Sequence, residues 1–558
     1  MRRDWDTTSN LLFKSFWVGS SFLWIPLCFI NFDPHHDGII LTTVNQLKLS
    51  LTNHGTWPFN QYGSVWAFPY LLISYLVPDN CLYFSIRLLT ISFYVATSYI
   101  LYKSALLLFN KKAAQATVIF FLTFQPFLGP WNTSLLPWPS SLVILLVSSI
   151  LYLLLVSAGQ ESVKTKGKLV ALGVLTAVIL GSRIQVGVLL LLSISFLIYF
   201  LRIGKFRYFI YGIILWLTPW SVFLQLKGWL VPSLYDSVIL GSQFLGSDHL
   251  HYPLPILSAF AGICVFIWLE LTLARKMKAP LNILFSILGV IATLVFSKRV
   301  LGDSFNFANY ISVTQRKILA ALFFAALIYV CAEIIKLFLK GRDVRDSRRT
   351  CLNLISLCSA AQAWPFFDQM HIWWSFAPIV LVIGEKFSHV SFIGRRSVRD
   401  CGLTLIFTLM TFLVISQFTG NKTELTTLDQ RFVFVNRSDD LEEARIQSFI
   451  DKNIPKGSHV LNLCPNAYPF FVPGKYVSDS RFFVYWSNFE SAPIAFRDYE
   501  ISKIDFVFVC QTYLYQGQEL LTYKSRQQAI LSELPTPKKL GSMHTGSFNF
   551  EIFTTNQN

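Results

Sequence analysis

Charged residues are scarce in this chain. They make up only 14% of its 558 residues, whereas soluble globular proteins carry roughly 25%. Hydrophobic residues make up 53%. This balance excludes a soluble globule and predicts a polytopic α-helical membrane protein, because an apolar excess of this size has to be covered by lipid.

Several motifs are also absent. The nine cysteines include no CxxC pair, so neither a zinc knot nor a disulfide framework is indicated. Only Cys464 and Cys510 lie in a water-soluble stretch, where they could pair if that stretch is extracytoplasmic. No GxxxxGK[ST] or GxGxxG loop is present to cradle a nucleotide. No small-residue cleavage site precedes or follows the apolar run from Leu11, which is therefore expected to be a retained first span.

About thirteen segments are apolar enough to cross a bilayer, which takes about 20 residues. The apolar piece 65–77 is shorter and contains Pro69, so it is expected to be an interfacial or re-entrant helix. The predicted spans are 11–31, 82–109, 113–129, 138–158, 168–182, 185–202, 208–226, 254–274, 280–297, 318–338, 350–366, 372–390 and 401–419.

The net charge of +16 comes largely from short Lys/Arg clusters between the spans. Such clusters mark cytoplasmic loops and are no sign of nucleic-acid binding. If 65–77 does not cross, the clusters fall on one side, which predicts a cytoplasmic N-terminus in an inner or plasma membrane. The clusters are Arg2/Arg3, Lys111/Lys112, Lys164–Lys168, Arg202–Arg207, Arg275–Lys278, Lys336–Arg349 and Lys386–Arg399.

The composition changes near residue 420, which predicts two domains. Residues 1–419 form the transmembrane domain, with outer juxtamembrane helices at about 34–77, and 420–558 form a soluble extracytoplasmic α/β domain. Within the second domain the pattern predicts one helix and four short strands. The helix is expected over 439–453 and the strands over 459–463, 482–486, 506–510 and 548–553.

The cluster Asp33-Pro34-His35-His36-Asp37-Gly38 follows the first span. Carboxylates and imidazoles at the mouth of a membrane helix are costly to keep near hydrocarbon and often functional. One interpretation is structural: Asp33 caps a helix whose first residue is Pro34. The other is catalytic: Asp33 or Asp37 takes the proton from a hydroxyl or amine that attacks a sugar carbon.

The same cluster raises the question of a metal. His35, His36 and Asp37 include enough ligands, but no second His/Cys set with zinc-like spacing follows, so zinc is not expected. A loosely held Mg²⁺ or Mn²⁺ on Asp33 and Asp37 stays open. No cofactor is otherwise indicated.

Other candidates for substrate or donor binding lie on the same predicted outer face. Gln61 and Tyr62 form either an interfacial anchor or a wall of the site. Arg183, between two spans, either snorkels to the interface or binds a lipid phosphate. Arg299 is a weaker phosphate candidate. Asp368 and His371 pair with each other or face the cavity of the Asp33 cluster.

Together these motifs resemble bacterial relatives of the GT-C glycosyltransferases, a class that includes protein O-mannosyltransferases and the aminoarabinose transferase acting on lipid A. The resemblance implies a catalytic acid in the first outer loop and a sugar donor carried on a polyprenyl phosphate. By the same resemblance, Asp33 or Asp37 is the base, Arg183 approaches the donor phosphate, and Asp368 and His371 border the pocket. The chain departs from better-known members, which carry a more compact acidic pair.

The expected function is therefore transfer of a sugar from a polyprenyl-phosphate donor to an extracytoplasmic glycan, lipid or protein acceptor. One alternative is a transporter or flippase of lipid-linked glycans, although ionisable residues are nearly absent from the span centres. A second alternative is a non-catalytic membrane scaffold whose C-terminal domain docks a partner.

Overall fold

The structure is a computed structural model. It describes residues 2–29, 36–52, 57–58, 62–63, 65–125, 138–158, 165–240, 307–340, 347–363, 369–388, 396–419, 423–428, 431–436, 440–471, 474–478, 480, 503–512, 517–534, 537–545 and 548–555.

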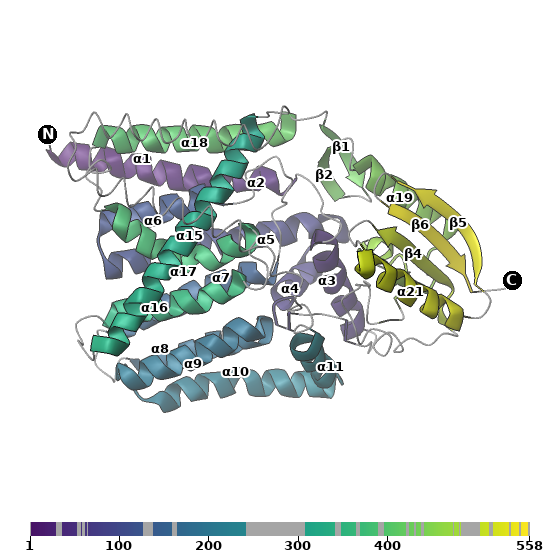
Figure 1. The fold of residues 1–558 in the computed structure, drawn as a ribbon, viewed down its shortest axis with the longest axis horizontal. Coiled ribbons are helices and arrows are strands. Elements are labelled where there is room, and N and C mark those ends of the chain that lie inside the picture. Colours follow the sequence, from purple (N-terminus) through teal and green to yellow (C-terminus); the bar gives the residue numbers. More distant parts are fainter. Residues whose placement is uncertain are drawn as a thin grey trace.

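A bundle of long apolar helices forms the larger part of the molecule (Figure 1). Among the described residues, four segments are long and apolar enough to cross a membrane: Cys81–Leu108, Pro139–Ser157, Phe206–Leu226 and Ile318–Lys336. The bundle helices are α1 (Arg2–Phe22), α2 (Trp24–Leu27), α5 (Asp79–Leu108), α6 (Lys111–Thr123), α7 (Pro139–Ser157), α8 (Lys166–Ser182), α9 (Ile184–Phe200), α10 (Phe206–Leu226), α15 (Phe307–Lys340), α16 (Ser347–Ala360), α17 (Gln369–Ser388) and α18 (Arg396–Thr419).

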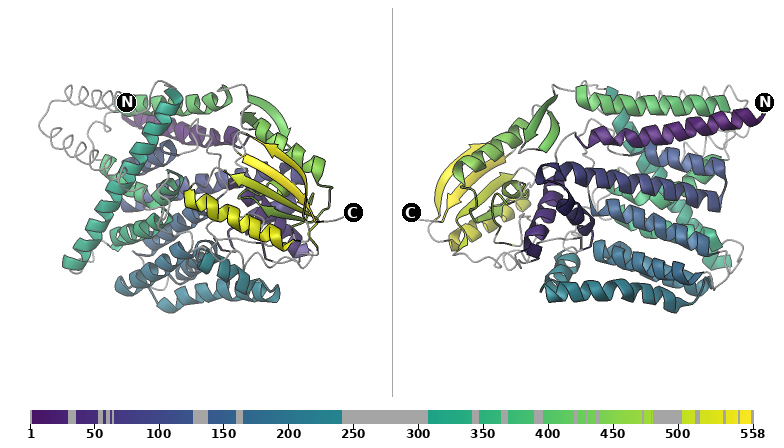
Figure 2. Two further views of the ribbon diagram at one scale, coloured as in Figure 1. Left: turned by 45° about the vertical axis from the view of Figure 1, so that its right-hand side comes forward. Right: turned by 180° about the vertical axis from the view of Figure 1, so that it is seen from behind.

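Shorter helices lie at one end of the bundle, between it and the C-terminal region (Figure 2, right). Helix α4 has only 9 residues, too few to cross a bilayer at 1.5 Å per residue. These elements are α3 (His36–Thr52), α4 (Phe68–Leu76), α11 (Leu230–Leu234) and the π-helix η2 (Tyr235–Leu240). The 3₁₀ turn η5 (Ala361–Ala363) follows α16.

The C-terminal region, residues 423–555, combines sheets and helices. Strands β1 (Thr423–Leu428) and β2 (Arg431–Asn436) form an antiparallel hairpin. A second sheet has the order β3-β4-β6-β5, in which β3 and β4 pair in parallel and the β4–β6 and β5–β6 pairings are antiparallel. Its strands are β3 (Val460–Leu463), β4 (Phe506–Thr512), β5 (Lys538–His544) and β6 (Phe548–Thr554), and the helical segments are α19 (Asp440–Asn453), η6 (Tyr468–Phe470) and α21 (Gly517–Glu533).

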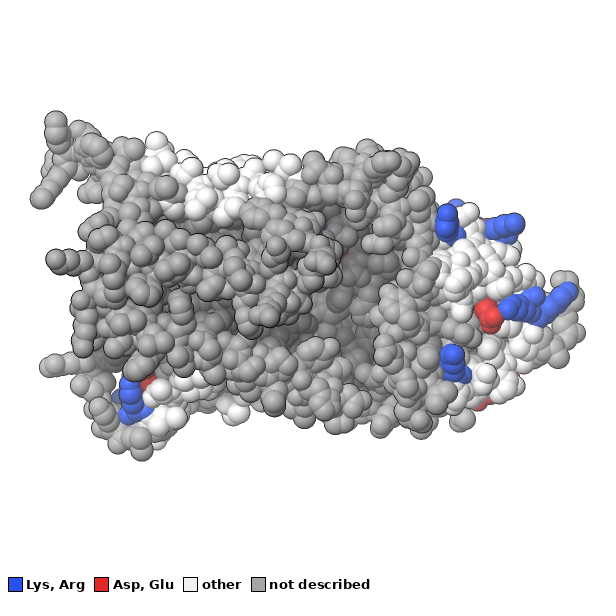
Figure 3. Space-filling view, turned by 45° about the horizontal axis from the view of Figure 1, so that its top comes forward, with Lys and Arg blue, Asp and Glu red and all other residues white. Residues whose placement is uncertain are grey.

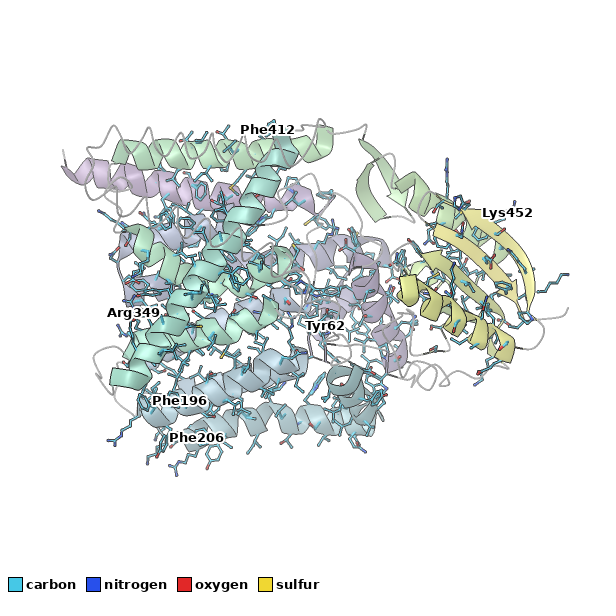
Figure 4. All side chains as sticks on the ribbon, in the orientation of Figure 1. Tyr62, Phe196, Phe206, Arg349, Phe412 and Lys452 are labelled. Carbon is cyan, nitrogen blue, oxygen red and sulfur yellow. The ribbon has the colours of Figure 1, made fainter. Side chains whose placement is uncertain are left out.

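The two ends of the bundle differ in what they carry. The N-terminus and Arg349, from the predicted cytoplasmic clusters, lie at the end far from the C-terminal region (Figures 1 and 4). Tyr62 lies at the near end, between bundle and C-terminal region (Figure 4). On the face in Figure 3, the coloured Lys and Arg side chains lie at the two ends of the molecule.

Most predicted elements have a counterpart in the structure. Each predicted span overlaps a helix, except 254–274 and 280–297, which lie outside the described residues. Helix α19 and strands β3, β4 and β6 coincide with predicted segments, whereas the predicted strand 482–486 lies outside the described residues. Strands β1, β2 and β5 and helix α21 have no counterpart among the segments predicted from the sequence.

Cys464 and Cys510 are side by side as free thiols. Val509 pairs with Leu463 in the parallel register, so the next residues along, Cys510 and Cys464, are neighbours across the strands. Gln527 of α21 donates to the carbonyls of Leu463 and Cys510 at 2.7 and 2.9 Å. Burial, and then the contact with the Cys510 thiol, raise the pKa of Cys464 well above its ordinary value.

Both thiols are buried, so a maleimide cannot reach them, and the raised pKa of Cys464 further disfavours its reactive thiolate form. We therefore expect neither Cys464 nor Cys510 to react with a maleimide in the folded protein, and both to react once the chain is unfolded. Mass spectrometry of the labelled peptides measures this. Peptides that stay unlabelled after unfolding, until a reductant is added, would contradict the free-thiol pair.

Candidate functional site

A buried ion pair links the first turn of α3 to α5. The guanidinium Nη2 of Arg87 lies 2.6 Å from Asp37 Oδ2, and both side chains are fully buried. The Tyr83 hydroxyl donates to the same oxygen at 3.3 Å, and its ring lies 4.4 Å from the Arg87 guanidinium carbon. Without the carboxylate, the apolar helix would bury an unpaired charge, which costs far more than burying the pair.

The same guanidinium also fixes the end of the first span. Arg87 Nη1 donates to the carbonyl oxygens of Leu27 and Cys28 at 3.1 and 3.2 Å. Leu27 is the last residue of the short helix α2 and Cys28 is its C-cap, positions at which helix carbonyls generally need a partner from outside the helix. One cation therefore joins three segments: the end of α2, the start of α3 and the N-terminal third of α5.

Arg183 forms a second group of contacts at the junction of α8 and α9. Its backbone is extended, with φ −154° and ψ 91°, and separates the two helices. The buried guanidinium donates to the Gln362 carbonyl at 3.3 Å and to the Ser140 hydroxyl. Its carbon lies 5.8 Å from the Tyr62 ring, which itself packs edge-on against Trp138 at 5.2 Å.

Glycine allows the Tyr62 segment to reach Arg183. Gly63 has φ +110°, and a Cβ there would lie 2.4 Å from the Gly181 carbonyl oxygen. The Val65 amide donates to that oxygen at 2.9 Å. A side chain at position 63 would break this contact, because it fits neither the backbone angle nor the space.

His371 connects to this second group through its own helix. Its ring lies 5.3 Å from Trp374, whose carbonyl accepts from Gln362 Nε2 at 3.3 Å. Trp374 Nε1 donates to the Tyr94 hydroxyl at 3.2 Å, and Tyr94 belongs to α5, as Arg87 does. Helix α5 therefore contributes to both groups of contacts.

The structure brings some of the predicted site residues together and does not describe others. Tyr62 and Arg183 are brought together, and His371 joins them through Trp374 and Gln362. Asp37 is held by Arg87, a residue that the sequence analysis did not name. Its signal was present: an arginine within an apolar span needs an acidic partner. His36 begins α3; Asp33, His35, Gln61, Arg299 and Asp368 lie outside the described residues.

A divalent cation finds no ready-made site among the described residues. There, no group of three or more His, Cys, Asp or Glu side chains is placed to hold a metal ion. The Asp37 carboxylate faces the Arg87 cation, which already supplies its counter-charge. The described residues thus do not fit a metal centre on Asp37, and a role of Asp33 in binding Mg²⁺ or Mn²⁺ stays a prediction.

We expect Arg87→Ala to destabilise the protein by about 3–5 kcal/mol, because it leaves a buried carboxylate without its partner. Asp37→Leu combined with Arg87→Met removes both charges and should recover most of that loss. Thermal unfolding in detergent measures the effect.

Lys48 and Asp79 supply the matched control. Their 3.3 Å ion pair is partly exposed, so Lys48→Ala should cost less than about 1 kcal/mol. Equal losses for Arg87→Ala and Lys48→Ala would mean that the Asp37–Arg87 pair does not hold the end of the bundle together.

Comparisons with known proteins found similarity among solved structures. No protein-family model matches the chain, and no curated protein matches it.

ArnT from Cupriavidus metallidurans bound to undecaprenyl phosphate is 12% identical, with 100% of this chain and 99% of that chain covered and a TM-score of 0.48. Archaeal oligosaccharyltransferase AglB from Archaeoglobus fulgidus, in complex with an inhibitory peptide and a dolichol-phosphate, is 12% identical, with 98% and 74% covered and a TM-score of 0.46. The oligosaccharyltransferase from the same organism in complex with Zn and sulfate is 11% identical, with 89% and 68% covered and a TM-score of 0.45.

Proposed function

We propose that this protein is a membrane glycosyltransferase that moves a sugar from a polyprenyl-phosphate donor to an extracytoplasmic glycan, lipid or protein acceptor. The observation that carries the proposal is the buried Asp37–Arg87 pair at the start of α3. It fixes an acidic segment at the end of an apolar bundle, and helix α5, which carries Arg87, also connects to the Arg183 contacts through the Tyr94–Trp374 hydrogen bond. We propose that a lipid-borne phosphate and a water-soluble acceptor meet at this end of the bundle.

The proposed reaction is a single displacement at the anomeric carbon. A hydroxyl or amine of the acceptor attacks that carbon, and its proton passes to a carboxylate. The bond from the anomeric carbon to the phosphate oxygen breaks, so the lipid phosphate leaves with the bonding electron pair. Direct attack inverts the configuration of the sugar. The proposed donor is of the same chemical class as the lipids in the ArnT and AglB structures.

We propose the roles of the named residues as follows. Asp33 and Asp37 are the two candidates for the base. Arg183 lies near the leaving phosphate, where a fork of N–H donors suits its oxygens, and Tyr62, Gln61 and His371 line the pocket. His35, His36, Arg299 and Asp368 are proposed as further donor or acceptor contacts. Mg²⁺ or Mn²⁺ dependence is tested by adding a chelator to the assay.

Transfer from a radiolabelled polyprenyl-phosphate sugar tests the assignment of the base. Loss of a general base costs about 100-fold or more in rate, so we expect Asp33→Asn or Asp37→Asn to lose at least that much. Asp37→Leu with Arg87→Met separates chemistry from folding: a stable double variant without transfer supports Asp37 as the base. Full transfer by both single variants would remove the proposed base, and lipid flux without covalent transfer would favour a flippase.

The proposed orientation places the C-terminal region on the extracytoplasmic side of the membrane and the basic clusters in the cytoplasm. The structure offers exposed positions for both sides: Lys452 in the C-terminal region and Lys112 in a basic cluster. We expect a membrane-impermeant maleimide to label Lys452→Cys in intact cells and Lys112→Cys only after permeabilisation, each measured above the wild-type background. Labelling of both in intact cells, or of Lys112→Cys alone, would contradict this orientation.

A further inference from the structure

The C-terminal region touches α3 one residue after Asp37. A Cβ added to Gly38 would lie 2.4 Å from Cε1 and 2.8 Å from Cζ of Phe471. One turn further along α3, the Thr42 hydroxyl donates to the Phe470 carbonyl at 3.4 Å. Thr42, Phe470 and Phe471 are buried. The Phe471 ring therefore occupies the space that any larger residue at position 38 would need.

The ring of Phe471 is held by the core of the C-terminal region. Tyr468 lies 5.5 Å from Phe471 and packs perpendicular to Phe550 of β6 at 5.6 Å. Phe550 in turn stacks on Phe508 of β4 at 5.5 Å. Gln447 of α19 donates to the Tyr468 carbonyl at 3.0 Å, which fixes the turn that carries the two phenylalanines. The sheet thus sets where the Phe471 ring lies.

The first turn of α3 is therefore fixed by two contacts of different kinds. Arg87 holds Asp37 through an ion pair, and the ring of Phe471 packs closely against Gly38. Glycine inside a helix costs about 1 kcal/mol relative to alanine. Gly38 has no positive φ that would require a glycine, so the nearby ring is the physical reason for its lack of a side chain.

We propose that Phe471 is a positioning residue for sugar transfer, through which the C-terminal region holds the acidic segment of α3 in its reactive place. This inference rests on the proposed function and deepens it, because it assigns the C-terminal region a part in the chemistry. Phe471 acts through Gly38 and Asp37 and contacts no reacting atom. A displacement of about 1 Å is enough to cost about 100-fold in rate.

Paired variants test the proposal through the shape of the contact. Gly38→Ala should push against the ring and lower kcat about tenfold or more, with a smaller change in KM for the donor. Phe471→Ala should also lower kcat, because α3 loses its cover. In the double variant the new methyl group meets no ring, so kcat should rise above that of Gly38→Ala.

Gly167→Ala is the matched control. Gly167 also lies in the first turn of a helix, α8, and a Cβ there meets nothing within 4 Å. This variant should keep the wild-type kcat. Wild-type kcat in both Gly38→Ala and Phe471→Ala, or a double variant whose losses simply multiply, would overturn the proposal.

Hydrogen exchange gives a readout that does not need activity. Phe471→Ala in the full chain should speed amide exchange in residues 37–42 while α19 keeps its protection. Unchanged exchange in α3 would overturn the positioning role even if transfer is observed. Absence of transfer activity in the wild-type protein would refute the proposed function. Faster exchange in α3 of the Phe471→Ala variant would still support the packing of the C-terminal region on α3.

Discussion

The arrangement at this end of the molecule depends on one buried charge. Arg87 sits in an apolar helix, and its desolvation is offset by the Asp37 carboxylate and by two backbone carbonyls at the end of α2. Neither partner can move far without leaving a charge unpaired in a medium of low polarity. The end of the first span, the start of α3 and α5 are consequently fixed relative to one another. Phe471 packs against Gly38, the residue next to this fixed point.

Much of the architecture could be predicted from the sequence. Long apolar runs predict helices because the bilayer sets their length, and the predicted spans that lie among the described residues overlap helices. The C-terminal region was harder. Strand β5, with the sequence Lys-Lys-Leu-Gly-Ser-Met-His, lacks the β-branched and aromatic residues that favour a strand, and it forms because β6 offers an edge for pairing.

The candidate site could be predicted residue by residue but not contact by contact. Tyr62 and Arg183 were each named, yet their approach depends on the close packing of Gly63 on Gly181, which local patterns do not encode. Asp37 was named as a candidate base, and the structure places it beside an arginine 50 residues away in the chain. Pairings over such distances follow from how helices pack.

The contact between Thr42 and Phe470 joins residues 428 positions apart. A ribosome finishes α3 long before it makes the turn that covers it, so the start of this helix stays uncovered through most of synthesis. Phe471 can pack against the start of α3 only after the C-terminal sheet that holds its ring has formed. The first turn of α3, with Asp37 and Gly38, is therefore covered only in the full-length chain. A prematurely terminated product would form its helices and still leave this turn uncovered.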